Sequence, residues 1–258
     1  MCGDSTNSDD VLMLMGGKYA DCVVTDPPYN VAVENADGLT IANDNMKSED
    51  FFYFLQSAFQ NLSNSLREGG SFYIWYASCE TLNFYSAVKE AGLLAKQELI
   101  WRKNHFTLGR QDYQWAHEPC IYGWKEGAGH YFTESRKECT VFDDFPMGYA
   151  SMPKEDLVAW VKDYFENRDS GTMLYANKPA KDDLHPTMKP LSLIATLIKN
   201  SSEKGQLILD LFGGSGSTLM CCEQLDRKCY MMEYDPKFVD VIIERWESFT
   251  GRKAIKIK

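Results

Sequence analysis

Residues 207–225 read LILDLFGGSGSTLMCCEQL, which is an apolar run, a glycine-rich turn and then a stretch with helical periodicity. This order predicts a buried strand that turns sharply into a helix. Glycine in such a turn lets the backbone approach a bound ligand closely, and the N–H groups at the start of the helix point toward that ligand. The stretch therefore predicts the nucleotide-type site of an α/β protein with a mainly parallel sheet.

The glycine spacing narrows the class of ligand. The dinucleotide fingerprint GxGxxG, laid on Gly214 and Gly216, requires glycine where Leu219 stands, and the lysine of a P-loop is missing from the turn. The next apolar run ends in Glu233, about 20 residues beyond the loop, where a carboxylate accepts hydrogen bonds from ribose hydroxyls. This combination suits S-adenosylmethionine, which has a ribose but no phosphate. The alternatives are a nicotinamide cofactor site and a glycine turn with a purely structural role.

A second motif, TDPPYN at residues 25–30, ends another apolar run. Proline cannot donate a hydrogen bond to a sheet, so Pro27 and Pro28 lie just past the strand and stiffen the loop that follows. An ordinary loop start explains an isolated Asp-Pro-Pro equally well. The glycine loop in the same chain favours a functional role for Asp26, Pro27, Pro28 and Tyr29.

Apolar runs and helical patterns alternate along most of the chain, which predicts the α/β class. Residues 125–184 break this alternation with glycine, proline and acidic clusters around an amphipathic helix at 154–167, so we interpret them as an inserted recognition region. Glycines at 69–70, 92, 205 and 251 are expected to end helices. Strands are expected at 21–25, 71–76, 98–102, 120–124, 206–211 and 229–233, and helices at 49–67, 80–91, 190–201, 217–225 and 236–249.

Length and composition fit a globular chain of 258 residues that forms one domain, or one domain plus an insertion. The net charge of −10 argues against a protein that coats DNA non-specifically, but not against an enzyme with a local basic groove. The eight cysteines form no CxxC pair, so we expect reduced, mostly buried thiols and no metal. Because the sequence shows no bilayer-spanning run and no signal-peptide pattern, we place the chain in the cytoplasm.

The motifs, in this order, resemble those of the β class of amino DNA methyltransferases, which form N6-methyladenine or N4-methylcytosine. Members carry a DPPY-type catalytic motif, a target-recognition region, a His-Pro-Thr-x-Lys-Pro segment and finally the glycine motif. Here HPTMKP stands at 185–190 and DLFGGSGST at 210–218. The resemblance implies a Rossmann-like S-adenosylmethionine-dependent methyltransferase sheet in circularly permuted motif order. Its catalytic half would be 1–124, its target-recognition insertion 125–184 and its cofactor-binding half 185–258.

The resemblance also implies a role for each motif residue. In a flipped-out base, the exocyclic amine would donate to Asp26 and to the carbonyl of Pro27, while Pro28 stiffens the loop and Tyr29 stacks on the base. Asp4 would reach the adenine of the cofactor, which requires residues 254–258 and 1–3 to lie together at the third strand of the sheet. The residues expected to hold S-adenosylmethionine are Asp4, His185, Thr187, Lys189, Asp210, Phe212, Gly213, Gly214, Ser215 and Glu233.

Contacts with DNA are expected from the segment 101–118, which interleaves Arg102, Lys103 and Arg110 with aromatic residues. A solvated strand edge explains this segment equally well. We expect site-specific transfer of a methyl group to the N6 amine of adenine in double-stranded DNA, because the family associates DPPY mainly with adenine. The alternatives are N4-cytosine methylation, a non-catalytic DNA-binding regulator and a nicotinamide enzyme on the same fold. A homodimer and a cognate restriction endonuclease are left open as partners, as is an orphan enzyme.

Overall fold

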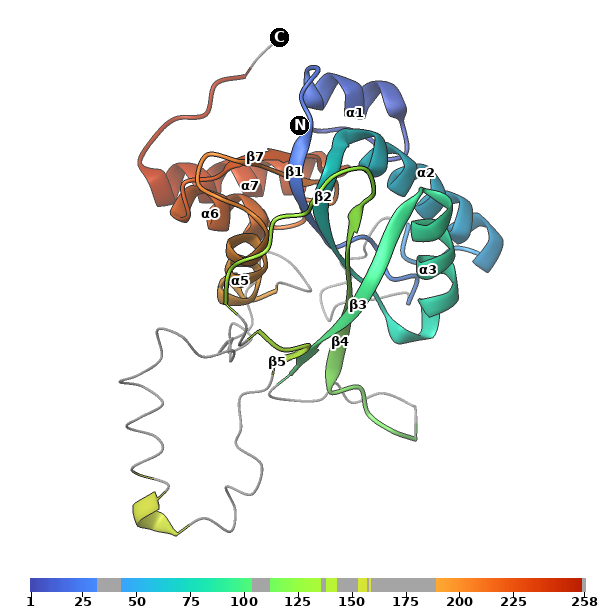
Figure 1. Ribbon diagram of the computed structural model, residues 1–258. Coiled ribbons are helices and arrows are strands. Elements are labelled where there is room, and N and C mark those ends of the chain that lie inside the picture. The colour runs from blue at the N-terminus through green and yellow to red at the C-terminus, as the bar shows by residue number, and fades with distance from the viewer. Residues whose placement is uncertain are drawn as a thin grey trace.

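A mixed sheet with the strand order β5-β3-β4-β2-β1-β6-β7 forms the centre of the computed structural model (Figure 1). The structure describes residues 1–31, 43–103, 112–135, 138–142, 153–156, 158 and 189–256. The described strands are β1 (Ala20–Thr25), β2 (Leu66–Trp75), β3 (Leu93–Arg102), β4 (His117–Lys125), β5 (Val141–Phe142), β6 (Leu207–Asp210) and β7 (Lys228–Met231). The described helices are α1 (Ser8–Met15), α2 (Ser48–Ser65), η1 (Ser78–Glu80), α3 (Thr81–Glu90), α5 (Leu191–Ser201), α6 (Ser217–Gln224) and α7 (Pro236–Thr250).

Strand β1 occupies the point where the strand order reverses. It pairs in parallel with β2 on one side and with β6 on the other, and β6 pairs in parallel with β7. Strand β4 runs antiparallel to both β2 and β3. In open α/β sheets, ligands bind beyond the carboxyl ends of the strands at such a switch point. The loops after β1 and β6 are therefore placed where a ligand site is expected.

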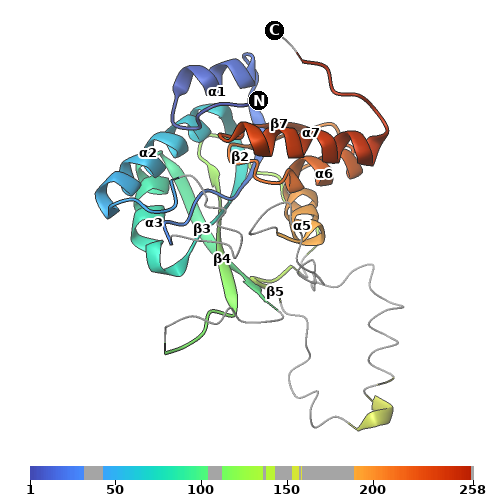
Figure 2. The same ribbon diagram turned by 180° about the vertical axis from the view of Figure 1, so that it is seen from behind.

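Helices cover both faces of the sheet (Figure 2), and each face has its own apolar core. Successive side chains of a strand point to opposite faces, so Val23 belongs to one core while Cys22 and Val24 belong to the other. The first core packs the sheet against α1, α2 and α3 through Val11, Met15, Phe51, Leu55, Phe59, Phe72, Ile74, Phe84, Val88 and Leu209. The second packs it against α5 and α6 through Tyr73, Trp75, Leu193, Leu197, Ile198, Ile208, Cys221 and Cys222.

The structure confirms the α/β class and the expected strands and helices of the described residues, with some differences at their ends. Helix α2 ends at Ser65, so the expected stop at 69–70 is wrong: these glycines lie inside β2, where Gly69 has a φ of 69°. Gly251 does end its helix, α7, in the left-handed conformation. Helix α1 and strand β5 were not expected, and most of the insertion at 125–184 lies outside the described residues.

The two chain ends were expected to lie together at the edge of the sheet. The N-terminal residues do lie there, but the described C-terminal residues do not. Residues 1–3 do lie beside the end of β7, where the Gly3 N–H donates to the Glu233 carbonyl at 3.0 Å and the Glu233 N–H donates to the Met1 carbonyl at 3.0 Å. Residues 254–256 form no strand and are exposed, because the chain extends away from the sheet after Gly251 ends α7 (Figure 1). Residues 257–258 lie outside the described residues.

The cysteines are free thiols, of which Cys22, Cys120, Cys221 and Cys222 are buried. Cys2, Cys79 and Cys139 are exposed and Cys229 is partly buried, so half of the eight thiols are buried where most were expected to be. In the described part of the chain, no helix combines the length and the apolar character needed to cross a membrane.

Candidate active site

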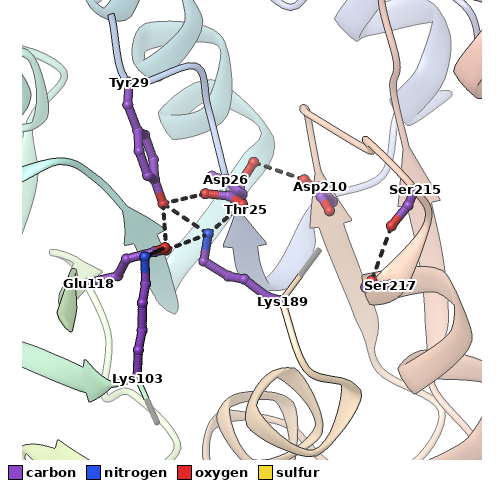
Figure 3. Close-up of polar contacts among 9 residues, drawn as sticks. All are labelled: Thr25, Asp26, Tyr29, Lys103, Glu118, Lys189, Asp210, Ser215 and Ser217. Atoms are coloured by element: carbon purple, nitrogen blue, oxygen red, sulfur yellow. Dashed lines mark hydrogen bonds and ion pairs between the residues drawn. The ribbon is translucent and has the colours of Figure 1, made fainter. Parts of the chain in front are cut away.

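The DPPY loop and the glycine loop leave the sheet from neighbouring strands, β1 and β6 (Figure 3). The Thr25 hydroxyl, on the last residue of β1, donates a hydrogen bond of 2.8 Å to Oδ1 of Asp210, the last residue of β6. Both side chains are buried, with exposed fractions of 1% and 3%. This bond fixes the two motifs side by side at the carboxyl edge of the sheet.

The DPPY loop is held in its shape by a buried carboxylate that sequence reasoning did not identify. Oδ1 of Asp44 accepts hydrogen bonds from the main-chain N–H groups of Tyr29 at 3.0 Å and Val31 at 3.3 Å. Between them, Asn30 adopts a left-handed φ of 58°, a conformation that asparagine tolerates better than most residues. The Asn30 side chain accepts a bond from the N–H of Met46. Asp44 and Asn30 therefore orient the loop from behind.

Replacement of Asp44 by alanine is expected to lower the free energy of unfolding by about 1–3 kcal/mol, because two loop N–H groups then lose their acceptor. Urea unfolding monitored by tryptophan fluorescence measures this change. Asp44→Asn is the matched control, since it keeps an oxygen at the same position and should lose less. Equal stability of the alanine variant and the wild type would show that Asp44 does not support the loop.

Five polar side chains gather beside the DPPY loop, and we refer to Asp26, Tyr29, Lys103, Glu118 and Lys189 as the DPPY cluster (Figure 3). The Tyr29 hydroxyl donates to Oδ1 of Asp26 at 2.7 Å. The Lys189 ammonium bonds Oδ2 of Asp26, the Tyr29 oxygen at 2.8 Å and Oε2 of Glu118 at 3.2 Å. The Lys103 ammonium lies 2.6 Å from Oε1 of Glu118. The cluster thus balances two carboxylates with two ammonium groups.

Burial and charge fix the protonation states of the cluster. Burial opposes ionisation of Glu118, but the Lys189 and Lys103 ammonium groups outweigh it and lower the pKa of the Glu118 carboxyl to about 2. Likewise the Asp26 and Glu118 carboxylates raise the pKa of Lys189 despite its burial. Burial raises the pKa of Tyr29 well above its usual value, so its hydroxyl remains a donor. Near neutral pH, Lys189 is therefore a cation with a side chain only 5% exposed.

The glycine loop is packed tightly against β7 and α7. A Cβ atom added to Gly213 would lie 2.8 Å from Cγ of Met231, and Gly214 and Gly216 have φ values of 51° and 82°. The Gly214 N–H donates to Oε2 of Glu233 at 2.7 Å, and the Asp235 N–H donates to Oε1 at 2.9 Å. Glycine is therefore required here by the backbone, and the Glu233 carboxylate is anchored directly beside the loop.

Asp210 is a buried carboxyl beneath the glycine loop. Burial raises its pKa to about 7, although Thr218, the Phe212 N–H and Thr25 donate hydrogen bonds to it. The unfolded chain releases this proton near pH 4 while the folded chain retains it until about pH 7. In that window the unfolded state binds fewer protons, so Asp210 makes the free energy of unfolding fall as the pH rises.

Asp210→Asn is expected to remove this decline, which amounts to at most roughly 4 kcal/mol. The asparagine oxygen can still accept the bonds from Thr25 and Phe212. Urea unfolding at intervals between pH 4 and pH 8 measures the difference between variant and wild type, which should grow until about pH 7 and then level off. A constant difference over this range would show that Asp210 ionises normally.

The structure places most of the residues that the sequence singled out, in two groups. Asp4, Phe212, Gly213, Gly214, Ser215 and Glu233 lie at or beside the carboxyl ends of β6 and β7 with Asp210. Oδ1 of Asp4 accepts bonds from the N–H and hydroxyl of Thr6, and the Phe212 ring lies 6.0 Å from that of Phe54. Lys189 belongs instead to the DPPY cluster. Arg110, His185 and Thr187 lie outside the described residues.

The residues expected to contact DNA differ in their exposure and in their partners. Arg102 is exposed at the end of β3, whereas Lys103 is largely covered and paired with Glu118. No role was assigned to Glu118 from the sequence, although it lies directly before Pro119 in a segment expected to contact DNA. The signal that could have identified Glu118 is its charge, since it lies on β4, a strand that is otherwise apolar at its centre.

These residues fit S-adenosylmethionine. The Gly213–Gly216 turn leaves no room for side chains toward Met231 and Ile242, and it brings the main chain directly beside the Glu233 carboxylate. A carboxylate at the end of the second strand suits ribose hydroxyls, while Asp4 on the adjoining segment suits an adenine amine. The acidic character of this end of the sheet suits a cofactor without phosphate groups.

Comparisons with known proteins agree with this geometry. The family model described as DNA methylase, of the N6/N4 methyltransferase type, matches residues 20–244. The type II methyltransferase M.HpaI of Haemophilus parainfluenzae is 25% identical over 243 residues, which cover 91% of this chain and 71% of the relative. The type II methyltransferase M.BglII of Bacillus subtilis is 21% identical over 255 residues, covering 93% of this chain and 66% of the relative. The chain thus spans about two thirds of the length of these relatives.

Solved structures show the same fold. The complex of M1.HpyAVI with S-adenosylmethionine superposes with a TM-score of 0.64 at 17% identity and covers 95% of this chain and 97% of its own. The PvuII DNA methyltransferase, which is cytosine-N4-specific, has a TM-score of 0.62 at 16% identity and covers 95% of this chain and 84% of its own. The family uses S-adenosylmethionine. With a family model matching most of its length and the fold of these enzymes, this chain belongs to the N6/N4 DNA methylase family.

Proposed function

We propose that this chain transfers a methyl group from S-adenosylmethionine to the N6 amine of adenine at a specific site in double-stranded DNA. The observation that carries the proposal is the placement of Asp26 beside the glycine loop, joined by the hydrogen bond between Thr25 and Asp210. An amine-binding carboxylate and a nucleotide-type loop thereby share one edge of the sheet. The DPPY sequence favours adenine over cytosine within the family.

Asp26 would act on the amine as an acceptor. The lone pair of an exocyclic amine is delocalised into the base, and the base pair hides the amine, so the base must first be flipped out. A carboxylate and the rigidly held Pro27 carbonyl can each accept one amine N–H. Accepting both bonds draws the nitrogen lone pair out of conjugation and stabilises the positive charge that the nitrogen gains. Positioning accounts for most of such catalysis, and the Asp44 support of the loop serves it.

S-adenosylmethionine supplies an electrophilic sulfonium methyl group when it is bound. Glu233 would accept the ribose hydroxyls, Asp4 the adenine amine, and the main chain of residues 212–215 would surround the methionine portion. His185 and Thr187 are proposed from the family motif to hold its carboxylate. The motif implies the same role for Lys189, but its ammonium bonds Asp26 and Tyr29 instead, so we assign the carboxylate to His185 and Thr187 alone.

The DNA is proposed to approach over the end of β4. The Tyr113 and Trp115 side chains, directly before this strand, are 91% and 41% exposed, and Glu118 of the DPPY cluster follows within the strand. Aromatic rings stack on unpaired bases with little sequence preference. Arg102 and Arg110 are proposed to contact phosphates, and residues 125–184 to recognise the target sequence. A second copy of the chain and a cognate endonuclease are further proposed partners.

Nucleoside analysis tests the proposal. Purified chain is incubated with S-adenosylmethionine and unmethylated bacterial DNA, which is then digested and analysed by mass spectrometry. N6-methyldeoxyadenosine is the expected product. N4-methyldeoxycytidine would keep the mechanism and overturn the assignment of the base. No methylated nucleoside, with cofactor binding confirmed by calorimetry, would overturn the catalytic role and support a DNA-binding regulator.

A further inference from the structure

The Lys189 ammonium is bound to the carboxylate of Asp26, the group proposed to accept the target amine. Oδ2 of Asp26 pairs with Lys189, and Oδ1 accepts the hydroxyl of Tyr29. Lys189 lies almost fully inside the protein and is also placed over the rings of Tyr29 and Trp75, at 5.3 Å and 5.0 Å from their centroids. The described structure therefore shows Asp26 in a state in which its charge is already neutralised.

That state opposes the proposed reaction, on which this inference rests. The amine nitrogen becomes positively charged as it takes up the methyl group, and Asp26 can stabilise that charge only if its own charge is not cancelled by an adjacent ammonium. A cation held on Asp26 would also repel the nitrogen directly. The ammonium must therefore be moved from Asp26 when the amine arrives, and in a buried site it needs another anionic partner.

Glu118 is already in place to be that partner. Its Oε2 lies 3.2 Å from Nζ of Lys189 and 3.3 Å from the Tyr29 oxygen, so both groups that bind Asp26 also reach Glu118. Its other oxygen is fixed by Lys103 at 2.6 Å. A small shift of the two side chains transfers their bonds from Asp26 to Glu118 without exposing a charge to the apolar core.

We propose that Glu118 is a positioning residue that takes over Lys189 and the Tyr29 hydroxyl when the target amine replaces them on Asp26. Glu118 touches neither the base nor the cofactor in this account. It acts through Lys189, and Lys103 acts by holding Glu118 in place. The DPPY cluster is thus an exchange site in which one ammonium has two carboxylate partners.

A double-mutant cycle tests this exchange. Glu118→Gln keeps the shape of the side chain but removes its charge, so Lys189 should remain on Asp26 and kcat should fall by about 100-fold. Lys189→Gln removes the competing cation and should cost only about tenfold. In the double variant, the loss of Glu118 should add nothing, so that kcat returns to the level of Lys189→Gln. A merely structural role of Glu118 would instead make the two losses multiply.

Two further variants keep the test decisive. Asp226→Asn makes the same carboxylate-to-amide change in the exposed Lys204–Asp226 pair, whose atoms lie 2.8 Å apart, and should leave kcat unchanged. If Glu118→Gln does not fold, Lys103→Met frees Glu118 instead, and its loss of kcat should also vanish in the Lys189→Gln background. An active wild type with multiplying losses would overturn the exchange alone. A wild type that methylates no DNA would overturn the proposed function and the exchange with it.

Discussion

Asp26→Ala is expected to lower the rate of methyl transfer by at least about 10³-fold while the affinity for S-adenosylmethionine stays unchanged. Asp26 supplies the carboxylate that would accept the amine N–H, whereas the residues proposed to hold the cofactor ring and ribose lie at the ends of β6 and β7. Single-turnover assays with saturating cofactor measure the rate, and calorimetry measures the affinity. Retained turnover would show that Asp26 does not bind the amine.

Asp26→Asn separates the charge of Asp26 from its shape. The amide keeps one oxygen acceptor, but it cannot balance the Lys189 ammonium or the charge that develops on the amine nitrogen. We expect a loss close to that of the alanine variant, since charge stabilisation is the larger contribution. Thermal unfolding of both variants controls for a loss of stability, because the buried Lys189 loses Asp26 as a charged partner and retains Glu118. A nearly active asparagine variant would mean that hydrogen bonding alone suffices.

Glu233→Ala is expected to weaken the binding of S-adenosylmethionine by roughly 10- to 100-fold, because hydrogen bonds to a charged group are worth about 1.5–3 kcal/mol. The proposed bonds to the ribose are lost, and the Gly214 N–H loses its acceptor as well. Calorimetry measures the dissociation constant. At saturating cofactor the rate should be largely restored, in contrast to the Asp26 variants.

A matched pair of variants separates the ribose from the loop. Glu233→Gln keeps one oxygen, which can still accept the Gly214 N–H, so the glycine loop should retain its shape while the Asp235 N–H loses its acceptor. Its affinity should lie between those of the wild type and Glu233→Ala, because a neutral acceptor forms weaker bonds to hydroxyls. An unchanged dissociation constant in both variants would remove Glu233 from the cofactor site.

Much of this fold follows from local sequence signals. The apolar runs gave β1, β6 and β7 within about two residues, since buried parallel strands are continuous apolar stretches. The polar first half of β3 was missed, because its exposed residues 95–98 lack an apolar pattern. Helix α1 was missed although Asn7 caps it and Asp9 and Asp10 occupy its first turn. Strand β5, with two residues, is too short to leave a signal.

The two motif loops were predictable because each carries its chemistry within a few consecutive residues. The residues that contact those loops from other parts of the chain were not predictable. Glu118 and Lys189 meet Asp26 from positions about 90 and 160 residues further along the chain, and sequence alone does not show which strand ends will be neighbours. Asp44 was missed for the same reason, since its role depends on hydrogen bonds to the main chain of Tyr29 and Val31. Long-range polar contacts are where the structure adds most.

The proposed reaction is methylation of a base amine in DNA at the Asp26 loop. Its most direct test is single-molecule sequencing of unmethylated genomic DNA after incubation with S-adenosylmethionine and either the wild type or Asp26→Ala. We expect N6-methyladenine in one short sequence context with the wild type and no modified base with the variant. Unmodified DNA with a wild type that binds the cofactor, or equal modification by both proteins, would contradict it.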